Sequence, residues 1–166
     1  MERVPEEQRT LNVTQEVANL GIVRPPLVYL ASIGTGSLLE FRWPLPFLPN
    51  EISAPLGGLL LVVAAVLFFS SIGRFRAAGT PVPGNKPTTV IVRTGLYRFS
   101  RNPIYLAFSL LQLGIASWVN SLWLICTLIA AVALMAYIVI PREERYLERR
   151  FGAEYLDYKA SVRRWL

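Results

Sequence analysis

The sequence predicts an all-α integral membrane protein with four transmembrane helices, of which the last two form an antiparallel hairpin. Two observations carry this prediction. Of the 166 residues, 53% are hydrophobic, and long uncharged runs alternate with short charged blocks. The basic residues also gather on one predicted side of the membrane. The length suits a single membrane domain over residues 1–166.

The chain begins with a charged segment and a short apolar run. Residues 1–25 mix both charge signs without an apolar core, so we interpret them as a cytoplasmic tail, not a signal peptide. The first predicted span, 26–39, has only 14 uncharged residues. It crosses a membrane only if its helix continues through Phe41 and Trp43. We include it because three spans would place the two termini on opposite sides. Residues 26–73 thus hold the first two spans.

The three remaining uncharged runs have the lengths of transmembrane helices, which need roughly 20 residues. They are 52–73, with 22 residues, 103–119, with 17, and 122–140, with 19. Only Val119-Asn120-Ser121 connects the last two runs, so 103–140 is predicted to be a helical hairpin that ends at Pro141.

The basic residues predict the orientation. Of the 17 Lys and Arg, 16 lie in the N-terminal tail, in the loop 74–102 or in the C-terminal segment 141–166, and only Arg42 lies elsewhere. The positive-inside rule places both termini and that loop in the cytoplasm. The absence of targeting signals favours a prokaryotic plasma membrane.

Two residue types limit the chemistry. The chain has no histidine, which removes the commonest general base and the commonest zinc ligand. Its single cysteine, Cys126, offers neither an internal disulfide nor a metal cluster. We therefore expect neither metal nor nucleic acid among the partners.

The loop 74–102 is predicted to be structured. Its stretch 79–87 is too rich in Gly and Pro for a helix interior, and the β-branched residues 88–92 favour extended backbone. Thr94-Gly95 is typical of a turn. The loop ends in GLYRFSRNPIYLA, residues 95–107, where a basic aromatic stretch meets an apolar run.

Asn102-Pro103 predicts the start of a helix, because Asn caps free N–H groups and Pro suits the first position. The positive end of the helix dipole favours an anionic group there. Tyr105 lies one turn further into the helix. The alternative interpretation is a capped helix end with snorkelling arginines and interfacial tyrosines.

The hairpin brings two carboxylates to this helix end. Pro103 and Pro141 lie on the same side, so Glu143 and Glu144 are expected close to 101–105. Adjacent carboxylates at an interface need partners. A ligand could supply them, and so could arginines at helical spacing.

The C-terminal segment is amphipathic, with a predicted break at Gly152. Its apolar side is formed by Tyr146, Leu147, Phe151, Tyr155, Tyr158, Val162 and Trp165. Such helices either lie on the membrane or fold over the loop 74–102 as a lid.

Two sequence blocks resemble a known family. TGLYRFSRNPIYLA resembles the "GPYR…R(H/N)PxYxG" block of the integral-membrane methyltransferases, which include isoprenylcysteine carboxyl methyltransferase and the phospholipid methyltransferases. IPREERYLERRFGAEYLDYKASVRRWL is similar to the "EExxLxxxFGxxYxxYxxxVxR" ending of that family. The two blocks flank the hairpin and cover 94–164.

The resemblance implies S-adenosylmethionine as methyl donor, bound at the cytoplasmic face below the C-terminal helices. It also implies a lipid or lipophilic acceptor, such as an isoprenylcysteine carboxylate, that enters from the membrane. By position, the cofactor-binding residues are Tyr97, Arg98, Arg101, Asn102, Pro103, Tyr105, Glu143 and Glu144. Glu144, Tyr105 and Asn102 are the implied catalytic residues, and Arg142 and Arg164 would orient the acceptor.

The sequence departs from the family pattern at three positions, with Asn102 for histidine, Leu96 for proline and Ala107 for glycine. Asparagine does not take a proton near neutral pH, and the methyl group of Ala107 is expected to narrow a pocket that needs close backbone approach. Methyl transfer is an in-line displacement that rests on alignment and exclusion of water. A carboxylate or thiolate acceptor needs no base. An amine or phenol would need one, with Glu143, Glu144 and Tyr105 as the candidates.

Two other functions remain open at this point. Sterol-reductase-like enzymes end in a related pattern and bind NADPH, but they are much longer. A non-catalytic membrane subunit could also have kept the scaffold, and the three departures leave this alternative open. Binding of the cofactor separates methyl transfer from both alternatives.

Overall fold

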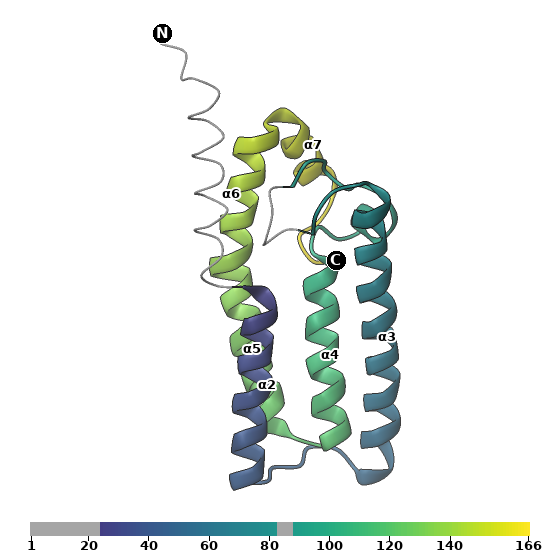
Figure 1. Cartoon of the computed structure of the whole chain (residues 1–166). Helices are drawn as coiled ribbons and strands as arrows, with labels where there is room; N and C mark the ends of the chain where they lie inside the picture. Colours follow the sequence, from purple (N-terminus) through teal and green to yellow (C-terminus); the bar gives the residue numbers. More distant parts are fainter. Residues whose placement is uncertain (1–23, 83–87) are drawn as a thin grey trace.

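The computed structural model describes residues 24–82 and 88–166 and shows a bundle of helices (Figure 1). Its elements are α2 (Pro25–Arg42), α3 (Asn50–Ala77), the 3-10 helix η1 (Gly95–Arg98), α4 (Pro103–Val119), α5 (Leu122–Leu134), the π-helical segment η2 (Met135–Val139), α6 (Ile140–Phe151) and α7 (Ala153–Ser161). Within these residues the only β pairing is one isolated bridge. The all-α prediction is confirmed. The predicted tail up to residue 23 and loop residues 83–87 lie outside the described residues.

Two helix boundaries depend on features that the sequence showed. α4 covers 103–119 as predicted, and it turns into α5 through Asn120, whose φ of 57° is left-handed. Asparagine tolerates this conformation better than most residues. α2 continues to Arg42, the extension that its apolar run required. α4 and α5 run side by side on either side of the turn at Asn120 (Figure 1).

The end of the hairpin differs from the prediction. Helical structure continues without a break from α5 through η2 and Pro141 to Phe151, although we expected the span to end at Pro141. Proline removes a backbone N–H and its ring crowds the preceding turn. The π-helical turn at 135–139 ends two residues before this proline and widens the helix there. The charged α6 thus extends the last helix beyond the apolar run.

Small residues let the helices approach closely. A Cβ added to Gly57 of α3 would lie 2.6 Å from the backbone N of Trp118 on α4. A Cβ on Gly36 of α2 would lie 2.7 Å from a methyl group of Leu124 on α5. Contacts between glycine and a facing helix are typical of helix packing in membranes. They fix α2 and α3 against the hairpin.

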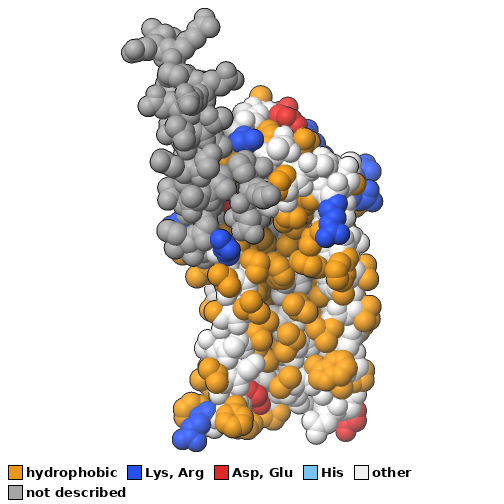
Figure 2. Space-filling view, viewed as in Figure 1, with side chains coloured by type: hydrophobic (Ala, Val, Ile, Leu, Met, Phe, Trp, Pro, Cys, Tyr) orange, Lys and Arg blue, Asp and Glu red, His pale blue; other side chains and the backbone are white. Residues whose placement is uncertain are grey.

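Apolar side chains cover much of the face of the bundle that Figure 2 shows. The exposed ones include Leu30, Leu38, Phe41, Leu59, Val62, Phe69 and Ile129. α3 and the continuous helix 122–151 have the length and hydropathy of membrane spans, whereas α4 is a shorter apolar helix. These surfaces indicate association with a membrane. Four complete spans and the cytoplasmic orientation remain predictions.

The two ends of the bundle differ. At one end, the Asn120 side chain bonds the backbone of Phe47 and Leu48 and closes the connection between α2 and α3. At the other end, the loop after α3, α6, α7 and the C terminus gather around the start of α4 (Figure 1). Residues 88–92 there form neither helix nor strand, and Gly95 has the positive φ of 63° that the predicted turn requires.

Candidate active site

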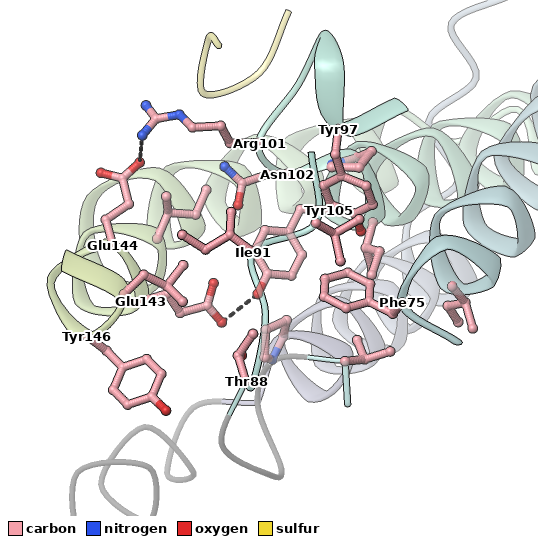
Figure 3. Close-up of a pocket in the computed structure, with 18 of the residues that line it drawn as sticks. Phe75, Thr88, Ile91, Tyr97, Arg101, Asn102, Tyr105, Glu143, Glu144 and Tyr146 are labelled. Atoms are coloured by element: carbon pink, nitrogen blue, oxygen red, sulfur yellow. Dashed lines mark hydrogen bonds and ion pairs between the residues drawn. The ribbon is translucent and has the colours of Figure 1, made fainter. Parts of the chain in front are cut away.

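A cavity of about 480 Å³ lies at the second end of the bundle, within the size range of small-molecule sites. Its walls come from the starts of α2 and α4, the end of α3, the loop after α3, α6 and the α7 region. Figure 3 shows polar side chains from α4 and α6 facing each other across it. Segments far apart in the sequence therefore form one site, as the hairpin predicted.

The closest polar contact in the cavity joins α4 and α6. The Tyr105 hydroxyl donates a hydrogen bond of 2.6 Å to Oε1 of Glu143 (Figure 3). Tyr105 is buried, and Glu143 is half-buried because it faces the cavity. Ion pairs to Glu143 are absent from the described residues. Burial raises the pKa of its carboxyl to about 7, although the hydrogen bond from Tyr105 acts in the opposite direction. A carboxylate in this position favours a cationic or hydroxyl-bearing ligand.

Glu144 points in a different direction and has several cationic partners. Arg164 binds both of its oxygens, with Nε at 3.0 Å and Nη2 at 2.8 Å, and Nη1 of Arg101 lies 3.1 Å from Oε1. Lys159 is 3.9 Å away and lies closer to Glu148, at 2.5 Å. The hydrogen bonds to Glu144 raise the pKa of Arg164. Arginines are therefore the partners of Glu144, but they come from the loop before α4 and from the C terminus and not from the helical spacing that the sequence suggested.

Asn102 starts α4 differently from the prediction. Its side chain makes no capping bond to the helix. Instead, Nδ2 donates to the carbonyl of Arg164 at 2.9 Å, and the backbone carbonyl of Asn102 accepts from the N–H groups of Tyr105 and Leu106. The bond to Arg164 uses Nδ2, whereas a cap would accept through Oδ1, so the Asn102 side chain ties the C-terminal residues to the start of α4 instead of capping it. The amide still lines the cavity.

Tyrosines form a further wall. The Tyr158 hydroxyl on α7 donates to the carbonyl of Tyr97 at 2.8 Å, and the Tyr97 ring packs edge-on against Phe75. Burial raises the pKa of Tyr155 to about 12 and raises that of Tyr158 as well. Both phenols therefore stay neutral at physiological pH, and Tyr158 acts as a hydrogen-bond donor. α7 thus contacts residues 95–102, which we call the motif loop, as expected for the lid alternative.

The cavity also has an extensive apolar wall that the sequence motifs did not indicate. It comprises Leu27 of α2, Phe68, Ile72 and Phe75 of α3, and Ile104 and Phe108 of α4. The Phe108 ring lies 5.5 Å from Phe68 and 5.4 Å from Tyr29. The residues on α2 and α3 carry no motif, and only the folded bundle brings them to the cavity. A lipophilic ligand has matching surface here.

Most of the predicted site residues come together. The cavity is lined by Tyr97, Arg101, Asn102, Pro103, Tyr105, Glu143 and Glu144. Arg98 and Arg142 are exposed and lie outside the lining, and Arg164 contacts Glu144 from behind it. Leu96 and Ala107 also lie outside the lining, so the expected narrowing by the methyl group of Ala107 does not occur.

Comparison with known proteins identifies the family of the chain. A family model described as phospholipid methyltransferase matches residues 52–154, more than half of the chain. A protein of Haemophilus influenzae described as uncharacterized is 45% identical over 65 residues, which are 38% of this chain and the whole of that protein. No solved structure matches the chain.

Proposed function

Because this chain belongs to the phospholipid methyltransferase family, we propose that it transfers a methyl group from S-adenosylmethionine to a lipophilic acceptor in the cavity at the start of α4. The observation that carries the proposal is the composition of that cavity. One wall presents a carboxylate, an amide and a guanidinium from the two motif blocks, and the other is apolar.

The residues present fit the cofactor. Tyr146 lines the cavity, and its buried hydroxyl has no hydrogen-bond partner among the described residues, which is typical of a site that expects a polar ligand. Glu143 would hold an ammonium or ribose hydroxyls, and Arg101 with the start of α4 would hold a carboxylate. When bound, S-adenosylmethionine supplies a methyl group on a positively charged sulfur, so the site needs no metal.

The side chains of this protein would align the reactants and exclude water. The apolar wall around Phe108 would take the hydrocarbon part of the acceptor. If the methyl acceptor must lose a proton, the Glu143 carboxylate would take it, because Oε1 already accepts a hydrogen bond from the Tyr105 hydroxyl inside the cavity. Glu144 is less suited to this task because arginines occupy both of its oxygens.

The same proposal fixes an orientation. Arg42 is the basic residue that the sequence places outside the N-terminal tail, the loop 74–102 and the C-terminal segment, and it lies at the end of the bundle opposite the cavity. Under the positive-inside rule, the cavity end would therefore face the cytoplasm, where S-adenosylmethionine is made available. The lipid-facing surfaces of α2 and α3 would let an acceptor reach the cavity from the membrane.

The test is calorimetric titration of the purified protein in detergent with S-adenosylhomocysteine, with NADPH in a parallel titration. We expect saturable binding of the first ligand alone. The combined variant Glu143→Gln and Tyr105→Phe should weaken it, whereas Glu154→Gln, an exposed change from acid to amide, should not. A folded protein that binds neither ligand would refute methyl transfer, and binding of NADPH alone would favour a reductase.

A second measurement addresses the acceptor. Protein in vesicles of phosphatidylethanolamine is supplied with S-adenosylmethionine carrying a labelled methyl group, and label is counted in the chloroform extract. We expect extractable label that the combined variant abolishes. Label that stays in the aqueous phase would contradict a lipophilic acceptor.

A further inference from the structure

The last five residues, 162–166, run back across the start of α4, and we call them the C-terminal strap. The backbone N–H of Arg101 donates to the carbonyl of Arg163 at 3.0 Å, and Ser100 and Arg163 form the isolated β-bridge. The next carbonyl of the strap, at Arg164, accepts the Asn102 side chain at 2.9 Å. The strap thus bonds directly to two residues that line the cavity.

The strap is anchored at two further points. The Arg164 side chain makes two charge-assisted hydrogen bonds to Glu144 of α6, which is only 6% exposed. Trp165 packs against the buried cluster that contains Tyr105 and Ile140. Since Glu144 also contacts Arg101, one carboxylate joins α6, the motif loop and the strap. Bidentate pairs of this kind fix geometry as well as adding stability.

We propose that the C-terminal strap positions Arg101 and Asn102 for the cofactor, and that Glu144 and Arg164 are positioning residues that hold the strap in place. This inference rests on the proposed function and assigns these two residues a role other than catalysis or acceptor binding. The polar wall of the cavity is complete only while the strap is docked. By linkage, a ligand that needs this wall stabilises the docked strap.

The chain offers a matched control for Arg164. The neighbouring Arg163 carries the same charge and an exposed side chain, and its contacts among the described residues are made by its backbone. Replacing Arg163 by alanine therefore changes the net charge equally and leaves the anchor intact.

The first measurement compares the affinity of Arg164→Ala, Arg164→Lys and Arg163→Ala for S-adenosylhomocysteine. We expect Arg164→Ala to lose affinity about tenfold or more, the size of one lost charge-assisted bond. Arg164→Lys should recover part of it, and Arg163→Ala should match the parent protein. Equal affinities for the two alanine variants would overturn the inference.

The second measurement works without any ligand and separates this inference from the proposed function. Trp43, Trp118 and Trp123 lie at the opposite end of the bundle, after α2, at the end of α4 and at the start of α5. Trp165 therefore reports on the strap. Acrylamide quenching of tryptophan fluorescence is measured for each protein and for the same protein with Trp165→Phe. The difference between the two is the quenching of Trp165.

We expect Arg164→Ala, but not Arg163→Ala, to raise the quenching of Trp165, because the strap leaves the cluster. Unchanged quenching would overturn the inference even in a protein that binds the cofactor. If the parent protein binds no S-adenosylhomocysteine, methyl transfer fails, and the quenching result still decides whether Glu144 and Arg164 hold the strap.

Discussion

Glu143 and Glu144 are adjacent on α6 but belong to two different regions of the molecule. Glu143 faces the cavity and bonds the neutral Tyr105 hydroxyl. Glu144 faces Arg101 of the motif loop (Figure 3), and it also pairs with Arg164 of the C-terminal strap. One residue along a helix rotates a side chain by about 100°, and here that rotation separates a site for a ligand from a structural anchor.

The difference teaches how to rank acidic residues at a membrane interface. A carboxylate with excellent cationic partners is already neutralised and mainly holds segments together. A carboxylate whose partner is neutral keeps capacity for a ligand. Sequence position alone ranks the two glutamates equally, so the comparison depends on which elements cover each face of α6.

The largest expected effect breaks the anchor. Glu144→Ala leaves the Arg101 side chain, 10% exposed, without its carboxylate. Removing one partner of a buried pair is costly, and with Arg164 38% exposed we expect a loss of about 2 kcal/mol in the free energy of unfolding. Denaturant or thermal unfolding in detergent measures it. Glu148→Ala, which breaks the more exposed pair with Lys159, should cost clearly less; equal losses would contradict the anchor.

The next largest effect tests the role of Glu143 in the cavity, apart from the anchor at Glu144. Glu143→Gln keeps a group that can still bond the Tyr105 hydroxyl but removes the charge. We expect affinity for S-adenosylhomocysteine to fall by about tenfold, or about 1.4 kcal/mol, with little change in the free energy of unfolding. Calorimetry and unfolding on the same preparation measure both. A destabilised protein with parental affinity would mean that the two glutamates have exchanged roles.

Much of this comparison could be predicted from the sequence. The two-residue break after Val119 required a hairpin, and the hairpin placed Glu143 and Glu144 near 101–105. The different roles of Glu143 and Glu144 could not be predicted. They depend on the return of the C-terminal strap to Asn102, which is a contact between residues 62 apart in the sequence. The continuation of the last helix through Pro141 was also missed, since the π-helical turns that accommodate it have no sequence signal here.

A third, smaller effect concerns the tyrosine wall of the cavity, where α7 contacts the motif loop. Tyr158→Phe removes the bond of 2.8 Å from α7 to the carbonyl of Tyr97. A buried carbonyl that loses its donor typically costs about 1 kcal/mol of unfolding free energy. Because the ring remains, we expect the packing against Tyr155 to persist. Unfolding measurements test it, with Tyr137→Phe, on an exposed side chain, as the control; identical stabilities would show that the bond does not hold α7 to the loop.

The smallest effect sets the baseline for both glutamates. Glu154 lies at the start of α7 with its carboxylate 3.6 Å from Arg93, and the two side chains are 58% and 41% exposed. Exposed pairs contribute little because water and salt screen them, so Glu154→Gln should change the free energy of unfolding by about 0.5 kcal/mol or less. Its affinity for S-adenosylhomocysteine should equal that of the parent. An effect as large as that of Glu143→Gln would mean that the net charge of this end of the bundle, not the position of Glu143, governs binding. A null result assigns the loss in Glu143→Gln to the cavity itself.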